Sequence, residues 1–132
     1  MIRTDQCEFS PLEAAAGFPG RLHFDGMTVE EDVLELRFLC PQIDIVGIVK
    51  TDSHLLLRFA NESANFLEFN KLPINSCRLW VSESSKLLSE LACLSGGVFD
   101  GVRPRHYLFV FSNATIEFVC LSEIVIDKEV CR

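Results

Sequence analysis

The sequence predicts an α+β fold in which a twisted antiparallel sheet of about six to eight strands carries one main helix packed on it. Apolar residues recur with period two along most of the chain, which is typical of strands. Only residues 82–97 combine helical spacing with capping signals. The connections are short, which antiparallel neighbours allow and parallel neighbours do not. The alternative that the sheet curls towards a half-barrel stays open.

The size and composition indicate a single domain, residues 1–132, because the chain is close to the commonest domain length. Hydrophobic residues make up 48% of it and include 11 Phe, enough for a core that needs neither a metal nor a disulfide. The same composition excludes intrinsic disorder. No linker, internal repeat or low-complexity segment divides the sequence.

The N-terminal quarter contains one helical turn and then the first strands. Residues 12–16 favour a single turn of helix that ends at Gly17. A strand at 22–24 precedes Asp25-Gly26, a dipeptide typical of tight turns. Residues 33–39 alternate apolar and charged side chains, as expected for a strand with one buried and one solvated face.

Three further strands are expected at 43–50, 54–60 and 66–70. Turn-forming residues separate them at 51–53 and 61–64. Because these connections are short, we expect the strands to follow one another as a meander within one sheet.

The only strong helix signal follows a strand expected at 77–81. Ser82 or Ser84 can cap the helix, and Gly96-Gly97 suits its end. An apolar stripe, which we expect to pack on the sheet, consists of Leu87, Leu88, Leu91 and Leu94.

The C-terminal third returns to strands. Residues 107–111 are apolar on both faces, so this strand should be buried on both sides. Residues 115–121 should pair back with it after a short turn, and 124–126 can add a last strand.

The charge balance restricts the class of partner. The chain has 19 acidic and 12 basic side chains, a formal net charge of −7. This charge disfavours nucleic acid and anionic membranes, because binding to either depends on Lys and Arg. It favours a basic partner and a fast encounter with it. The alternative is that the acidity only keeps the protein soluble.

The cysteines indicate a reducing compartment. None of the six forms a C-x-x-C pair, and four lie in apolar runs, so we interpret them as free thiols, mostly buried: Cys7, Cys40, Cys77, Cys93, Cys120 and Cys131. The first residues have no apolar signal region, and no apolar run approaches the ~20 residues that span a bilayer. We therefore expect a cytoplasmic protein.

No motif for catalysis, a metal or another cofactor is recognisable. His23, His54 and His106 are scattered, and we interpret them as partly exposed strand residues rather than metal ligands. No glycine-framed nucleophile turn accompanies a Cys or Ser, so no catalytic residue is assigned. The basic run 103–106 leads into aromatic residues, as in some single-strand binders, but a solvated loop at a strand entry fits the acidic chain better.

The densest charge cluster is acidic. Five carboxylates lie within eleven residues that contain no base: Asp25, Glu30, Glu31, Asp32 and Glu35. The spacing and glycine of a calcium loop are absent. These residues are either a solvated loop or one edge of a surface that binds a cationic partner, and we take them as candidate partner-binding residues.

Small size, acidity and one α+β domain without catalytic motifs loosely resemble the immunity proteins of bacterial toxin–immunity systems, including contact-dependent inhibition. The resemblance rests also on the alternating segments 25–39 and 106–121. It implies one-to-one binding to a cognate toxin domain, often a nuclease whose basic active site an acidic surface would block. The alternative is a small-molecule-binding or catalytic domain with a pocket between the sheet and the helix at 87–94.

Overall fold

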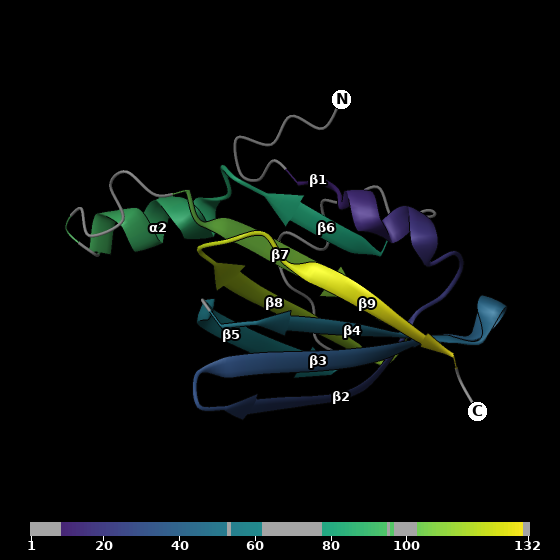
Figure 1. The fold of residues 1–132 in the computed structure, drawn as a ribbon. Coiled ribbons are helices and arrows are strands. Elements are labelled where there is room, and N and C mark those ends of the chain that lie inside the picture. The colour runs from purple at the N-terminus through teal and green to yellow at the C-terminus, as the bar shows by residue number, and fades with distance from the viewer. Residues whose placement is uncertain (1–8, 53, 62–77, 95, 97–102, 131–132) are drawn as a thin grey trace.

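The computed structural model describes residues 9–52, 54–61, 78–94, 96 and 103–130, and these form two antiparallel sheets packed face to face (Figure 1). The four-stranded sheet has the order β2-β3-β4-β9. Its strands are β2 (His23–Glu30), β3 (Val33–Cys40), β4 (Ile45–Thr51) and β9 (Val125–Val130).

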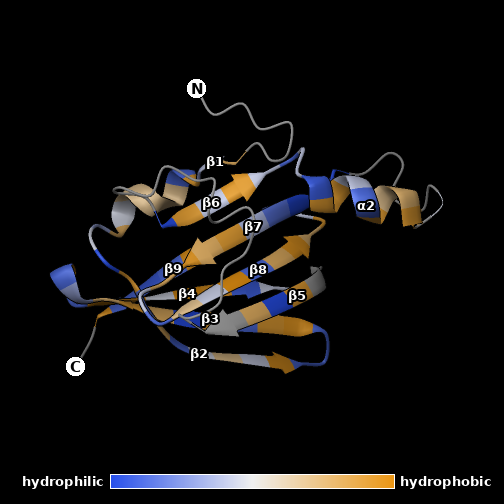
Figure 2. Ribbon diagram, turned by 180° about the vertical axis from the view of Figure 1, so that it is seen from behind, coloured by the Kyte–Doolittle hydropathy of each residue, from blue (hydrophilic) through white to orange (hydrophobic). Residues whose placement is uncertain are grey.

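The five-stranded sheet has the order β1-β6-β7-β8-β5. Its strands are β1 (Ser10–Pro11), β6 (Leu79–Ser82), β7 (Arg105–Val110), β8 (Ala114–Cys120) and β5 (His54–Asn61). The helical segments are the 3-10 turns η1 (Glu13–Gly17) and η2 (Pro41–Ile43) and the α-helix α2 (Lys86–Leu94). Helix α2 and η1 lie at opposite ends of the molecule (Figures 1 and 2).

The main core lies between the two sheets. Alternate residues of β3 point into it, and so do alternate residues of β7 and β8, because side chains on a strand alternate between faces. Among the described residues, its buried aromatic members are Phe18, Phe38, Tyr107, Phe109, Phe111 and Phe118. Gly47 of β4 pairs with Phe38 of β3, and a Cβ at this glycine would collide with the Phe38 ring. Glycine is therefore required opposite this ring.

The other face of the five-stranded sheet is buried as well. Trp80, Leu108 and Val110 form a second cluster there, against which Phe9 packs. His106 and Glu117 share this face and are also fully buried. Burial of β7 on both faces agrees with the sequence prediction, and it places polar side chains in a dry environment.

The chain is mostly antiparallel sheet with one α-helix among the described residues, as the α+β prediction stated, but the single sheet was wrong. Strand β5 does not continue the meander beside β4. It pairs with β8 in the other sheet, while β9 pairs with β4. A short connection and an alternating pattern are equally compatible with both arrangements, so the sequence could not distinguish them. The strand predicted at 66–70 lies outside the described residues.

The tight turn predicted at Asp25-Gly26 was also wrong. Strand β2 continues through it, and the register with β3 shifts between Phe24 and Gly26, which marks a β-bulge. The hairpin turns instead at Glu31 and Asp32, whose φ angles are 50° and 68°. The acidic run therefore forms the end of a hairpin.

Helix α2 is capped by Ser85, which lies one residue after Ser84 and three after Ser82, the two predicted caps. Ser85 precedes its first residue, and the Ser85 hydroxyl accepts the backbone N–H of Leu88 at 3.3 Å. Ser82 Oγ accepts the backbone N–H of Ser84 instead. Leu88 is buried, but Leu94 is 84% exposed. The predicted stripe thus packs through its first turn and not along its whole length.

Candidate functional site

A hollow on the outer face of the four-stranded sheet contains three of the predicted partner-binding residues. It has a volume of about 640 Å³ and is lined by Thr28, Glu30, Glu31, Val33 and Glu35. Glu30 pairs with Val33, and Thr28 pairs with Glu35, so these four side chains share one face of the β2–β3 hairpin. The loop between the strands is strongly hydrophilic (Figure 2).

The geometry of the hairpin end holds Glu31 at the hollow. A two-residue turn with two positive φ angles matches the twist of the flanking strands, and it usually contains Asn-Gly. Here Glu31 and Asp32 occupy those positions. Glu in the left-handed region costs about 1–2 kcal/mol. The chain therefore has a Glu at a turn position where Asn would make the fold more stable.

Glu35 is the one candidate acid with basic neighbours among the described residues. Lys50 Nζ lies 3.7 Å from its Oε1, and Arg37 Nη1 lies 3.8 Å from its Oε2. Arg37 also approaches Glu129, at 3.5 Å. The segment 25–35 contains no base, but strands β3 and β4 bring two bases to its last carboxylate. Glu35 is thus partly neutralised.

The other candidate acids differ in place and in surroundings. Glu30, Glu31 and Asp32 are exposed and form no ion pair with another described residue. Asp25 lies at the bulge, on the order of 15 Å along β2 from Glu30. The structure therefore brings Glu30, Glu31 and Glu35 together, leaves Asp32 at the turn beside them, and separates Asp25.

A buried polar network, missed in the sequence, lies on the other sheet. Ser85 Oγ is 2.7 Å from His106 Nδ1, and His106 Nε2 is 3.1 Å from Glu117 Oε1. The Arg58 guanidinium donates to the same carboxylate oxygen through Nε, at 3.1 Å, and through Nη2. Ser85, His106 and Glu117 are fully buried.

The partners fix the direction of these hydrogen bonds. A carboxylate only accepts, so His106 Nε2 carries a proton and donates to Glu117. In the neutral imidazole the Ser85 hydroxyl then donates to Nδ1. Burial alone would raise the pKa of Glu117, but hydrogen bonds from His106 and Arg58 outweigh it and hold this pKa below its ordinary value. Glu117 is therefore ionised at neutral pH.

The Ser–His–Glu arrangement resembles a hydrolytic triad in composition but not in accessibility. A nucleophile must reach its substrate, whereas the Ser85 hydroxyl is buried and caps α2. The network joins the start of the helix to β7, β8 and β5. We interpret it as structural.

The three histidines differ in their surroundings. The sequence interpretation of His106 as a partly exposed residue was wrong. Its burial could have been inferred from its position directly before residues 107–111, the strand predicted to be buried on both faces. His23 is exposed beside Ser112, and the side chain of His54 lies outside the described residues. In the basic run, Arg103 is exposed, whereas Arg105 already begins β7.

The remaining features of the described residues concern thiols, metals and membranes. Cys40 and Cys120 are buried free thiols, and burial raises the pKa of both, whereas Cys93 is exposed. The other three cysteines lie outside the described residues.

Within the described ranges, no group of His, Cys, Asp and Glu is arranged to hold a metal ion, and no helix has the length and apolarity needed to cross a membrane.

Comparisons with protein-family models, with curated proteins and with solved structures find no significant match to this chain, so its function has to be argued from its own residues.

Proposed function

We propose that this domain binds a basic protein partner through the end of the β2–β3 hairpin. The observation that carries the proposal is the pair of exposed carboxylates, Glu30 and Glu31, which line one hollow and form no ion pair with another described residue. With Glu35 behind them, they form a concave acidic surface, which we name the hairpin hollow.

The chemistry of the hairpin hollow suits an Arg or Lys side chain. Carboxylates accept paired hydrogen bonds from a guanidinium, which binds them in a fixed geometry. Val33 lines the same hollow and is 39% exposed, so it can contact the aliphatic part of such a side chain. A volume of about 640 Å³ is also large for a single bare ion.

The hairpin supplies the acids on a regular scaffold. Residues from Thr28 to Glu35 are fixed by the continuous pairing of β2 with β3, and β3 is paired on its other side with β4. A preorganised surface loses less conformational entropy on binding than a mobile loop does. The net charge of −7 would further speed the encounter with a cationic partner.

The finer proposal is that the partner is a toxin domain, for example a nuclease, and that binding neutralises it. Its support is the loose resemblance to immunity proteins in size, acidity and domain organisation. An acidic hollow on a hairpin end could cover the cationic site with which a nuclease binds phosphate.

The test starts from the neighbouring genes: if one of them encodes a large secreted protein, its C-terminal domain is co-expressed with the chain. We expect the two to co-purify and the cells to survive. The Glu30→Lys/Glu31→Lys variant should lose protection and slow association by at least tenfold. Glu83→Lys/Glu90→Lys is the control, because it changes the net charge equally at exposed residues before and within α2.

Two results would contradict the proposal. If the hairpin variant and the α2 variant associate equally fast, only the net charge matters, and the hairpin hollow is not the site. If the chain neither binds nor protects against that domain, the toxin proposal fails. Binding to other basic proteins that still depended on Glu30 and Glu31 would retain the broader proposal.

A further inference from the structure

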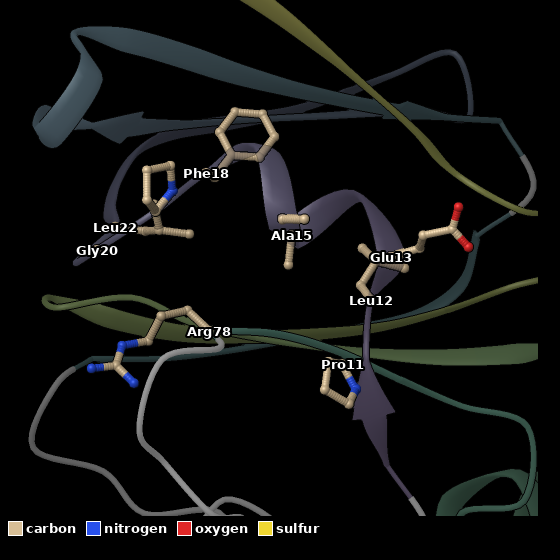
Figure 3. A pocket seen from close by; sticks show the side chains of 10 residues that line it. Pro11, Leu12, Glu13, Ala15, Phe18, Gly20, Leu22 and Arg78 are labelled. Atoms are coloured by element: carbon tan, nitrogen blue, oxygen red, sulfur yellow. The ribbon is translucent and has the colours of Figure 1, made fainter.

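A second cavity lies beneath η1, far from the hairpin hollow. It has a volume of about 510 Å³, within the range usual for small-molecule sites. Its apolar wall includes Leu12, Ala15, Phe18 and Leu22, and Arg78, the residue before β6, lines it as well (Figure 3). This cavity is not the pocket between sheet and helix that the sequence left open as an alternative, because α2 contributes no residue to it.

The cavity follows from the short side chains of η1. The turn has the sequence Glu-Ala-Ala-Ala-Gly and buries none of its own residues. Its backbone is tied to β6 by the Leu12 N–H, which donates to the Leu79 carbonyl at 2.8 Å. The alanines do not fill the space above Phe18 and Leu22, which are themselves 4% and 1% exposed core residues. The cavity thus reaches the core.

The lining of this cavity is mostly apolar but includes two charged residues, Arg78 and Glu13. These two residues lie on opposite sides of the cavity (Figure 3). Arg78 is half-buried, whereas Glu13 is exposed to water. A half-buried guanidinium interacts more strongly with a ligand charge than an exposed carboxylate does, because water screens the latter. The planar fork of a guanidinium matches a carboxylate.

We propose that this cavity binds a small amphipathic carboxylate, whose apolar chain contacts Leu12, Ala15, Phe18 and Leu22 and whose carboxylate binds Arg78. The site is independent of the hairpin hollow in position and in charge. A polar group at one end and an apolar body match the usual organisation of such sites.

The probe is octanoate, added to the full chain and followed by calorimetry and by the melting temperature. We expect saturable one-to-one binding and a rise in melting temperature. 1-Octanol, with the same chain and no charge, should bind at least tenfold more weakly. Arg78→Met keeps an unbranched side chain and should weaken octanoate at least tenfold, whereas Glu13→Gln should not weaken it.

A second variant tests the position of the apolar chain. Ala15→Leu should fill the cavity and abolish binding, while circular dichroism and the melting temperature report whether the variant is folded. The Glu30→Lys/Glu31→Lys variant should bind octanoate normally, so failure of one site is distinguishable from failure of the other. Absence of saturable binding, equal binding of octanoate and octanol, or normal binding by folded Arg78→Met and Ala15→Leu would each overturn the proposal.

Discussion

His106 and Glu117 lie side by side on β7 and β8, with the imidazole Nε2 3.1 Å from the carboxylate Oε1 and both side chains fully buried. The carboxylate also accepts from Arg58, whose side chain is 45% exposed, so the network runs from the buried face of the sheet to its surface. The second oxygen, Oε2, is buried and has no hydrogen-bond partner within the described part of the chain. A buried charge without its hydrogen-bond partners lowers the stability of the fold. Substitution of any member of this network should therefore lower the free energy of unfolding.

Glu117→Ala should lower the free energy of unfolding by about 3 kcal/mol, because it leaves the buried N–H of His106 unpaired and opens a cavity. Glu117→Gln retains an acceptor and should cost less, about 1–2 kcal/mol. Urea denaturation measures both. The control is Glu129→Gln, at a largely exposed carboxylate, which should change stability by less than about 0.5 kcal/mol. Equal effects of Glu117→Ala and Glu129→Gln would show that the network does not stabilise the fold.

The lowered pKa of Glu117 predicts how its contribution depends on pH. Its pKa in the folded state is below that in the unfolded state, so ionised Glu117 stabilises the protein above the unfolded pKa. This contribution is lost as the pH falls through the folded pKa. The stability difference between wild type and Glu117→Gln should therefore shrink on acidification below the ordinary pKa of a Glu. Urea midpoints at a series of pH values measure it, and a constant difference down to the acid transition would contradict the assignment.

Ser85→Ala should cost about 1–2 kcal/mol, because it removes both the cap of α2 and the hydrogen-bond partner of His106. Ser89→Ala, at an exposed position of the same helix, is the matched control and should be neutral or slightly stabilising. Thermal and urea denaturation of the two variants provide the comparison. If Ser89→Ala cost as much as Ser85→Ala, helix capping through Ser85 would be wrong.

The apolar stripe of α2 shows where sequence reasoning succeeds and where it stops. Its spacing correctly predicted a helix, but an isolated pattern does not show how far a helix extends past the sheet that it covers. Only the first turn is buried, at Leu88. Likewise, the alternation in β5 correctly predicted a strand, whereas its partner depends on contacts with β8, which is distant in sequence.

Leu88→Ala should therefore cost about 2–5 kcal/mol, as expected for a buried leucine. Leu94→Ala should change stability little, because that side chain is 84% exposed. The half-buried Leu91 should fall between them. Denaturant midpoints rank the three variants, and a Leu94 effect as large as that of Leu88 would show that the helix packs along its full length.

The candidate acids show a similar limit of sequence reasoning. Their density in the sequence was sufficient to mark Glu30, Glu31 and Asp32 as a unit. It did not show that Asp25 lies apart, because that depends on β2 continuing through Asp25 instead of turning there. Nor did it show the ion pairs of Glu35 with Arg37 and Lys50, which arise from the pairing of strands.

The positive φ angles of Glu31 and Asp32 allow stability and binding to be separated. Glu31→Asn/Asp32→Gly introduces the dipeptide that this turn conformation favours and should raise the free energy of unfolding by about 1 kcal/mol. It also removes two carboxylates, so association with a basic partner should slow. Urea denaturation measures the first effect, and association rates at low and high salt measure the second.

The single substitution Glu31→Asn, which retains the carboxylate of Asp32, is the intermediate control. A variant that became more stable and bound equally fast would show that the acids at the turn do not contribute to recognition. A variant that became less stable would show that the turn conformation carries no strain. Stabilisation combined with slower association would instead indicate that the acidic turn is retained for binding at the expense of stability.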